Sequence, residues 1–276
     1  PLLVPKTHGE EGATGGRLAG KVAIVTGAGS SGPGVGNGKA VSILFAREGA
    51  KVVCVDAVVE RADETVAAIV AEGGVASSCA VDVSKRDDCE RMAAVAVERY
   101  GRLDILHNNV GILSLQGIRE VTEDDWNRML AVNLTSMVLT TQAALPHLEA
   151  AGGGAIINVT SIAALRTYGP LTAYQTTKAG IIGLTISLAG QLADKRIRVN
   201  AIAPGQIWTP IVAAILSPQM REERRQSGLI QDEGTPWDVA WGAVYLASDE
   251  ARWVTGRVLV IDAGVTLTMR GGNRRE

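Results

Sequence analysis

Short apolar runs alternate with longer amphipathic segments along most of this chain. The short runs are rich in valine and isoleucine, and most are apolar at every position rather than at every second one. That pattern is typical of strands buried on both faces, as in a parallel sheet covered by helices. Strands are expected at residues 22–26, 51–55, 76–81, 103–107, 155–160, 197–202 and 257–261.

The segments between these strands show helical periodicity, with apolar residues recurring every three or four positions. A strand, a helix and a second parallel strand form a right-handed crossover, and repeated crossovers build one sheet with helices on both faces. We therefore predict an α/β fold with a doubly wound parallel sheet of about seven strands. Helices are expected at residues 37–48, 58–72, 86–99, 123–149, 173–193 and 236–247.

This sheet is expected to form a single domain over residues 18–268, after a flexible arm at 1–17 and before a tail at 269–276. The stretch 206–234 interrupts the regular alternation, because it is long, rich in Arg and Glu, and lies between a strand and a helix. Long segments of this kind are usually lids or binding loops. A solvated surface helix over residues 218–226 is the alternative interpretation.

Composition narrows the classes of function. The chain has 276 residues and is 46% hydrophobic, which suits one large α/β domain. Its net charge of −2 gives no electrostatic support for binding nucleic acid. No apolar run approaches the roughly 20 residues that span a bilayer, and the beginning lacks a signal-peptide pattern. We expect a cytoplasmic protein without nucleic-acid or membrane partners, and no metal, because Cys and His show no ligand spacing.

The first expected strand leads directly into a glycine-rich loop that runs from Gly27 to Gly38. Glycines allow the backbone to turn sharply and allow a ligand to approach it closely. The helix that follows would present free N–H groups and its positive dipole end to a pyrophosphate. The loop therefore predicts a dinucleotide site of the Rossmann type.

Asp56 ends the second expected strand. A carboxylate there can accept hydrogen bonds from the adenosine ribose hydroxyls and would repel a 2′-phosphate. The next two residues, Ala57 and Val58, supply no cation, so NAD is favoured over NADP. Residues that end the third and fourth strands are placed along the same crevice: Asp82, Val83, Asn109 and Gly111.

Tyr174 and Lys178 are one turn apart in an expected helix, and so share a face. A free phenol has a pKa of about 10, which a neighbouring positive charge would lower toward the range useful for proton transfer. Ser161 follows the fifth expected strand and can hydrogen-bond a carbonyl or alcohol oxygen. The Tyr–Lys spacing alone would also occur by chance on a surface helix.

Taken in this order, the motifs resemble those of the short-chain dehydrogenase/reductase family across about residues 18–268. The resemblance implies a proton-relay tetrad. Tyr174 would be the acid/base, and Ser161 would orient the substrate oxygen. Lys178 would lower the tyrosine pKa and hydrogen-bond the nicotinamide ribose, while Asn133 would hold a water that leads protons to solvent.

The resemblance also implies a set of cofactor contacts. One departure affects them: about five residues, Ser31 to Val35, look inserted into the glycine loop, which leaves open which loop residues touch phosphate. The expected NAD contacts are Gly27, Ser30, Ser31, Gly36, Asn37, Gly38, Asp56, Asp82, Val83, Asn109, Gly111, Tyr174, Lys178, Pro204, Gly205, Ile207 and Thr209.

The implied reaction is hydride transfer between NAD(H) and a secondary alcohol or its ketone. The substrate pocket should be walled by the largely apolar segments after the fourth, fifth and sixth strands, which favours a hydrophobic or cyclic alcohol. Arg166 there would either meet a carboxylate or be a surface arginine. The expected substrate contacts are Ser161, Leu165, Tyr168, Tyr174, Gln206 and Trp208.

Three rival functions remain. A 3-oxoacyl thioester reductase shares the tetrad, although Asp56 counts against the NADPH that such reductases usually take. An enoyl reductase would place its Tyr and Lys wider apart. A non-catalytic NAD-binding sensor or scaffold is the alternative from another class, and the intact Ser161, Tyr174 and Lys178 count against it.

Association with further copies is also expected. The helices at 123–149 and 173–193 carry apolar residues on more than one face, and such faces need a cover. The family resemblance implies a homotetramer, with the strand at 257–261 and the helix at 237–247 at a second interface.

Overall fold

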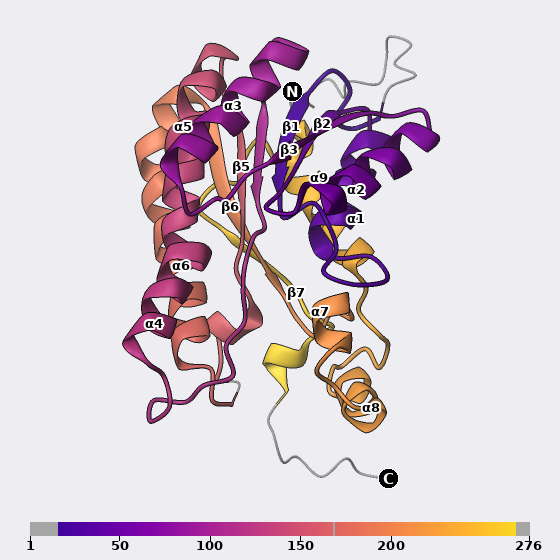
Figure 1. Cartoon of the computed structure of the whole chain (residues 1–276), viewed down its shortest axis with the longest axis vertical. Coiled ribbons are helices and arrows are strands. Elements are labelled where there is room, and N and C mark those ends of the chain that lie inside the picture. The colour runs from indigo at the N-terminus through magenta and orange to yellow at the C-terminus, as the bar shows by residue number, and fades with distance from the viewer. Residues whose placement is uncertain (1–15, 168, 269–276) are drawn as a thin grey trace, which may run out of the picture.

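The computed structural model describes residues 16–167 and 169–268. Its seven strands form one parallel sheet in the order β3-β2-β1-β4-β5-β6-β7, as Figure 1 shows. The predicted doubly wound fold is confirmed, with small shifts of strand boundary. The strands are β1 Val22–Thr26, β2 Lys51–Asp56, β3 Val75–Ala80, β4 Ile105–Asn108, β5 Gly154–Val159, β6 Ile197–Pro204 and β7 Val258–Ile261.

Helices cover both faces of the sheet (Figure 1). On one face α1 packs against α2 and α9, and on the other α3 packs against α5 beside α6. Two apolar cores result, one on each side of the buried valines and isoleucines of the strands. The helices are α1 Asn37–Arg47, α2 Val59–Ala71, α3 Arg86–Tyr100, α4 Glu123–Leu130, α5 Ser136–Ala150, α6 Thr172–Leu192, α7 Pro210–Ala213, α8 Pro218–Gln226 and α9 Pro236–Ala247.

The sheet reverses its winding direction between β1 and β4, because β2 and β3 lie on one side of β1 while β4 and all later strands lie on the other. Loops that leave the carboxyl ends of β1 and β4 therefore diverge and open a crevice, which is where open α/β sheets bind ligands. The glycine-rich loop follows β1 and the segment with Gly111 follows β4.

The expected lid at 206–234 contains two short helices, α7 and α8. Helix α8 has no buried residue, so the surface-helix interpretation of 218–226 is correct for that part of the segment. The lid is nevertheless held together by contacts among its own residues. The Arg221 guanidinium pairs with Glu233 and lies 4.1 Å from the centre of the Trp208 ring. Trp208 also donates its backbone N–H to the carbonyl of Gly234 at 2.8 Å.

The predicted arm and tail fall almost wholly outside the described residues. Arg17, at the end of that arm, is held rather than free, because its side chain pairs with Glu250 and its backbone N–H binds the Glu48 carboxylate at 2.9 Å. Within the described part of the chain, no helix combines the length and the hydropathy that crossing a bilayer requires.

Candidate active site

Tyr174 and Lys178 project from the first turns of α6, beside the end of β5. The Lys178 ammonium group is buried and donates a hydrogen bond to the backbone carbonyl of Val159 at 3.0 Å. It lies 5.7 Å from the centre of the Tyr174 ring. Ser161 follows β5 directly and accepts the Ala163 N–H at 3.1 Å, which fixes its side chain at the start of the next turn.

Burial changes the proton affinity of both groups on α6. It raises the pKa of Tyr174 above its ordinary value, with a hydrogen bond to Ser161 acting in the opposite direction. It lowers the pKa of Lys178 to about 8. Burial outweighs the lowering effects on the pKa of Tyr174 in this structure, and the effect expected of Lys178 stays a prediction. Burial acts on both groups because loss of solvent disfavours phenolate and ammonium alike.

Asn133 sits in a π-helical turn, Ala131–Thr135, which separates α4 from α5. Its side chain accepts the N–H of Ile112 at 2.8 Å and donates to the carbonyl of Ile112 at 2.9 Å. The widened turn thus fixes the irregular segment that follows β4 against the helix. The role of Asn133 in holding a water stays a prediction.

Gly111 is the point at which these residues converge. A Cβ added there would lie 3.2 Å from the Lys178 Nζ and 3.6 Å from the Asn133 Oδ1. A side chain at 111 would crowd the Lys178 ammonium group and contact the Asn133 amide. The backbone of this segment therefore passes directly beside the polar centre.

The glycine-rich loop is closely packed at its base. A Cβ on Gly38 would lie 1.9 Å from the carbonyl oxygen of Gly27, so only glycine fits. The Asn109 amide braces the loop by donating to the carbonyls of Thr26 at 3.2 Å and Gly27 at 3.1 Å. The Asn109 side chain thus holds the loop, and its expected contact with the cofactor stays a prediction.

Asp56 lies where the loop passes β2. Its carboxylate accepts the N–H of Gly29 at 3.1 Å and that of Val58 at 3.0 Å. Arg61, on the first turns of α2, also adjoins the loop, because a Cβ on Gly29 would lie 2.4 Å from the Arg61 Cβ. Sequence reasoning missed this arginine, since it tested only the two positions after Asp56.

The start of α1 offers a polar group without a partner. The Oδ1 of Asn37 is buried and has no hydrogen-bond partner among the described residues. Ser30 accepts the N–H of Gly36 at 2.9 Å, whereas Ser31 is exposed. An orphaned acceptor, a glycine-lined cradle and the free N–H groups of a helix start fit the diphosphate and ribose of a dinucleotide.

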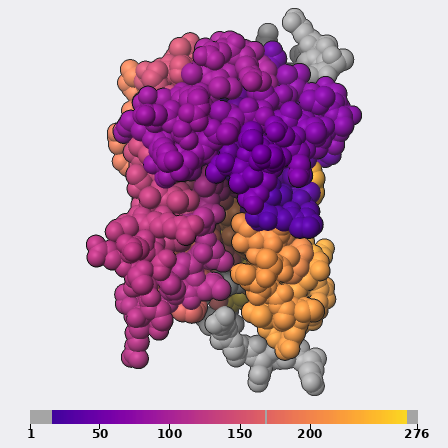
Figure 2. Space-filling view, in the orientation of Figure 1, coloured from indigo at the N-terminus to yellow at the C-terminus, as the bar shows by residue number. Residues whose placement is uncertain are grey.

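The inserted stretch of the loop reaches the lid. Cβ positions on Gly32 and Gly34 would each lie 3.7 Å from Pro210, the first residue of α7. Figures 1 and 2 show the indigo loop side by side with the orange lid. The phosphate loop and the lid therefore meet across the expected cofactor crevice.

The other expected cofactor residues occupy the carboxyl edge of the sheet in mixed roles. Asp82 accepts from the Ser84 N–H and hydroxyl, and Val83 packs in the core. Thr209 accepts the N–H of Val212 at 3.4 Å and so begins α7. Three more lie at the end of β6 and just beyond it: Pro204, Gly205 and Ile207.

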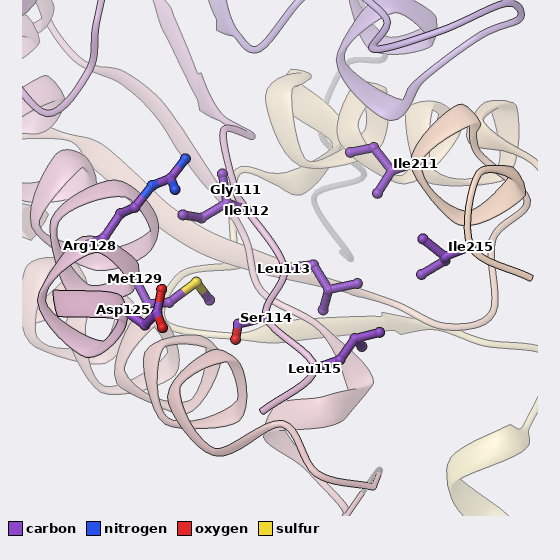
Figure 3. A pocket seen from close by; sticks show the side chains of 10 residues that line it. All are labelled: Gly111, Ile112, Leu113, Ser114, Leu115, Asp125, Arg128, Met129, Ile211 and Ile215. Atoms are coloured by element: carbon purple, nitrogen blue, oxygen red, sulfur yellow. The ribbon is translucent and has the colours of Figure 1, made fainter. Parts of the chain in front are cut away.

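A pocket of about 460 Å³ opens between the segment after β4, helix α4 and the lid helix α7. It corresponds to the hollow between the magenta and orange surfaces in Figure 2, and Figure 3 shows its side chains. The segments after β4 and β6 line it, as expected of a substrate pocket, whereas the segment after β5 does not. The contribution of α4 was not expected. The lining residues are Gly111, Ile112, Leu113, Ser114, Leu115, Asp125, Arg128, Met129, Ile211 and Ile215.

Several residues expected to contact the substrate do not line this pocket. Trp208 is stacked under Arg221, Gln206 accepts the Ser227 hydroxyl at 2.6 Å, and Leu165 is exposed. Tyr168 lies outside the described residues. Arg166 was expected either to meet a carboxylate or to be a surface arginine, and the structure gives it another role. Its guanidinium donates to the carbonyls of Val265 and Thr268 and so ties the loop after β5 to the C-terminal segment.

Known proteins match this chain over most of its length. A family model described as enoyl-(acyl carrier protein) reductase matches residues 34–266. The cyclohexadiene-diol dehydrogenase LinX of Sphingobium indicum is 40% identical over 90% of this chain and 97% of its own length. The 3-oxoacyl-[acyl-carrier-protein] reductase of Thermotoga maritima is 36% identical over 91% of this chain and 100% of its own length.

A solved structure agrees with the sequence matches. A 7α-hydroxysteroid dehydrogenase in complex with NADH and 7-oxo glycochenodeoxycholic acid has a TM-score of 0.85 and 35% identity, over 90% of this chain and 95% of its own. The Escherichia coli enzyme of that name is 35% identical in sequence. With the Ser161–Tyr174–Lys178 site in place on the same doubly wound sheet, the chain belongs to the short-chain dehydrogenase/reductase family.

Proposed function

We propose that this protein transfers hydride between NAD(H) and an apolar, cyclic secondary alcohol or its ketone. The observation that carries the proposal is that Lys178 and Asn133 adjoin Gly111, a residue that lines the mostly apolar pocket. Tyr174 lies next to Lys178 and hydrogen-bonds Ser161. Relatives of similar length support the alcohol class, since they include dehydrogenases named for cyclohexanol, a cyclic diol and a hydroxysteroid.

Tyr174 is the proposed acid/base. Its raised pKa keeps the phenol protonated at neutral pH, ready to donate to a ketone oxygen as charge develops there. In the reverse direction the phenol first loses its proton, and the resulting phenolate accepts the alcohol proton. Ser161, which hydrogen-bonds Tyr174, would orient the reacting oxygen. The bound cofactor supplies the hydride chemistry, while these residues supply position and proton transfer.

The residues that would hold NAD are those around the glycine-rich loop. Backbone N–H groups near Asn37 would receive the diphosphate, and Asp56 would accept from the adenosine ribose hydroxyls. Lys178, adjacent to Gly111, would meet the nicotinamide ribose. The close approach of the backbone at Gly38 and the unpartnered Asn37 oxygen support this placement.

We also propose a cytoplasmic homotetramer without nucleic-acid partners. Trp253 is 91% exposed and Trp241, on α9, is 50% exposed, which is unusual for such large apolar side chains. Val260 on β7 is exposed too, so the described part of the chain presents an apolar area near the outer strand. A second copy would cover it.

The decisive test measures NADH formation with NAD and a panel of cyclic secondary alcohols, with NADP in parallel. We expect turnover with NAD and at least one cyclic alcohol. Turnover only of a 3-oxoacyl thioester with NADPH would instead support the reductase alternative, which the Thermotoga relative favours. Tight NAD binding without turnover of any alcohol or ketone would support the sensor.

A further inference from the structure

The pocket beside Gly111 contains a cation that the proposed alcohol chemistry does not use. Arg128, on α4, lines the pocket and is exposed. Figure 3 shows its side chain extending from the helix toward Gly111 and Ile112. Among the described residues, its guanidinium makes no hydrogen bond or ion pair.

The carboxylate that shares the pocket is partly engaged. The Oδ2 of Asp125, which also lines the pocket from α4, accepts from the Thr122 hydroxyl at 2.9 Å and the Gln116 amide at 3.1 Å. These two hydrogen bonds hold the pKa of Asp125 below its ordinary value, with a smaller contribution from the charge of Arg128. Among the described residues, no hydrogen bond or ion pair joins Asp125 to Arg128.

Apart from Ser114, the rest of the lining is apolar. Leu113 and Leu115 come from the segment after β4, Met129 from α4, and Ile211 and Ile215 from the lid. An arginine at the edge of an apolar pocket has the planar fork of donors that binds a carboxylate through two hydrogen bonds. Such a pair is strengthened where apolar neighbours exclude water.

We propose that Arg128 binds an acidic group, a carboxylate, on the apolar alcohol substrate, so that the enzyme prefers hydroxy acids to neutral alcohols of the same shape. This inference rests on the proposed function and refines its substrate class. The apolar walls would hold the carbon skeleton, with the reacting hydroxyl near Tyr174 and the carboxylate at α4. The phosphates of the cofactor are the other source of negative charge near Gly111, and the experiment must separate the two.

The test compares Arg128→Gln and Arg128→Lys with wild type, using cholic acid and its methyl ester as matched alcohols. Arg119→Gln, which removes an exposed arginine outside the pocket lining, is the control. We expect Arg128→Gln to raise KM for cholate about ten- to hundred-fold, the loss typical of a charge-assisted hydrogen bond, with kcat nearly unchanged. KM for the ester should stay as in wild type. In the control Arg119→Gln, KM for cholate and KM for the ester should both stay as in wild type. Arg128→Lys should show a smaller rise in KM for cholate than Arg128→Gln.

A binding arm keeps the test independent of turnover. Titration calorimetry would measure cyclohexanecarboxylate binding to the enzyme with NADH present, and NADH binding alone. Weaker carboxylate binding in Arg128→Gln with unchanged NADH affinity supports the proposal, even if cholate is not oxidised. Weaker NADH binding in Arg128→Gln would assign Arg128 to the cofactor and overturn the proposal. The proposal would also be overturned if the mutation changed KM for the acid and for the ester equally, or changed neither. Absence of turnover with every alcohol tested, alongside intact carboxylate binding, would count against the proposed function instead.

Discussion

Lys178 hydrogen-bonds the backbone carbonyl of Val159, and this bond links the first turns of α6 to the last residue of β5. The ammonium group is thereby fixed in place although it is buried, and burial lowers its pKa to about 8. A site that needs the positive charge of Lys178 would lose that charge within the pH range in which enzymes are assayed. The burial of Lys178 against the Val159 carbonyl should therefore affect how the rate of the enzyme depends on pH.

We expect kcat/KM for ketone reduction to fall above about pH 8, as Lys178 loses its proton. Lys178→Met should lower kcat/KM about a hundredfold or more and remove that decline, because no group remains to titrate there. Initial rates measured from pH 6 to pH 10 provide the check. A wild-type profile that stays level through pH 9.5 would show that the charge on Lys178 is not required.

Tyr174→Phe removes the only hydroxyl proposed to exchange a proton with the substrate. We expect turnover to fall by about three orders of magnitude or more, because general acid/base catalysis and its positioning are both lost. NADH affinity, measured by fluorescence, should change little, since the ring remains. Residual activity within tenfold of wild type would remove Tyr174 from its assigned role.

Asp56→Ala should weaken NAD binding and relax discrimination against NADP. The mutation removes the acceptor for the ribose hydroxyls and leaves Arg61, beside Gly29, free to meet a 2′-phosphate. Adding Arg61→Ala should abolish the increase in kcat/KM with NADP. Asp63→Ala, on the exposed side of α2, should change kcat/KM with neither NAD nor NADP. The ratio of kcat/KM for NAD and NADP is the measurement. A wild-type preference for NADP would contradict the argument.

His107 makes the folded state sensitive to acid. It lies fully buried on β4, with its ring edge-on to Phe45 at 6.1 Å between centroids, and neither ring nitrogen has a partner among the described residues. Burial lowers its pKa from 6.5 to about 4. The unfolded chain therefore binds more protons between these values, so stability is lost as pH falls from 6.5 toward 4.

This loss should amount to about 3 kcal/mol by pH 4. The free energy of unfolding would be measured with urea at pH 7.5 and at pH 5. His107→Leu should make the difference between the two values smaller than in wild type, whereas His147→Gln, on α5, should not. A wild-type free energy of unfolding that is the same at both pH values would contradict the assignment.

The sequence predicted most of the fold because its signals are local. Continuous apolar runs mark the buried strands, and the glycines from Gly27 to Gly38 mark a close backbone approach whatever surrounds them. The positions proposed to be catalytic, Ser161, Tyr174 and Lys178, were predicted in the same way, from their places after β5 and on one face of α6.

Features that depend on long-range packing were missed. The pKa of Tyr174 is set by burial, which the Tyr–Lys spacing does not reveal. Arg128 lines a pocket whose other walls, the segment after β4 and the lid, come from other parts of the chain. Trp208 and Arg166 have partners distant in sequence, in the lid and in the C-terminal segment.

The inserted loop gives the last prediction. Gly32 and Gly34 lie against Pro210, so the stretch at 31–35 and the lid together cover the expected position of the diphosphate. A bound cofactor would leave only when this contact opens, and such steps often limit turnover. Shortening the loop by the five residues 31–35 should therefore speed NADH release several-fold, as measured by stopped-flow fluorescence. Pro210→Gly, which removes the partner surface without touching the glycine loop, should act in the same direction; if both variants release NADH at the wild-type rate, the contact does not retain the cofactor.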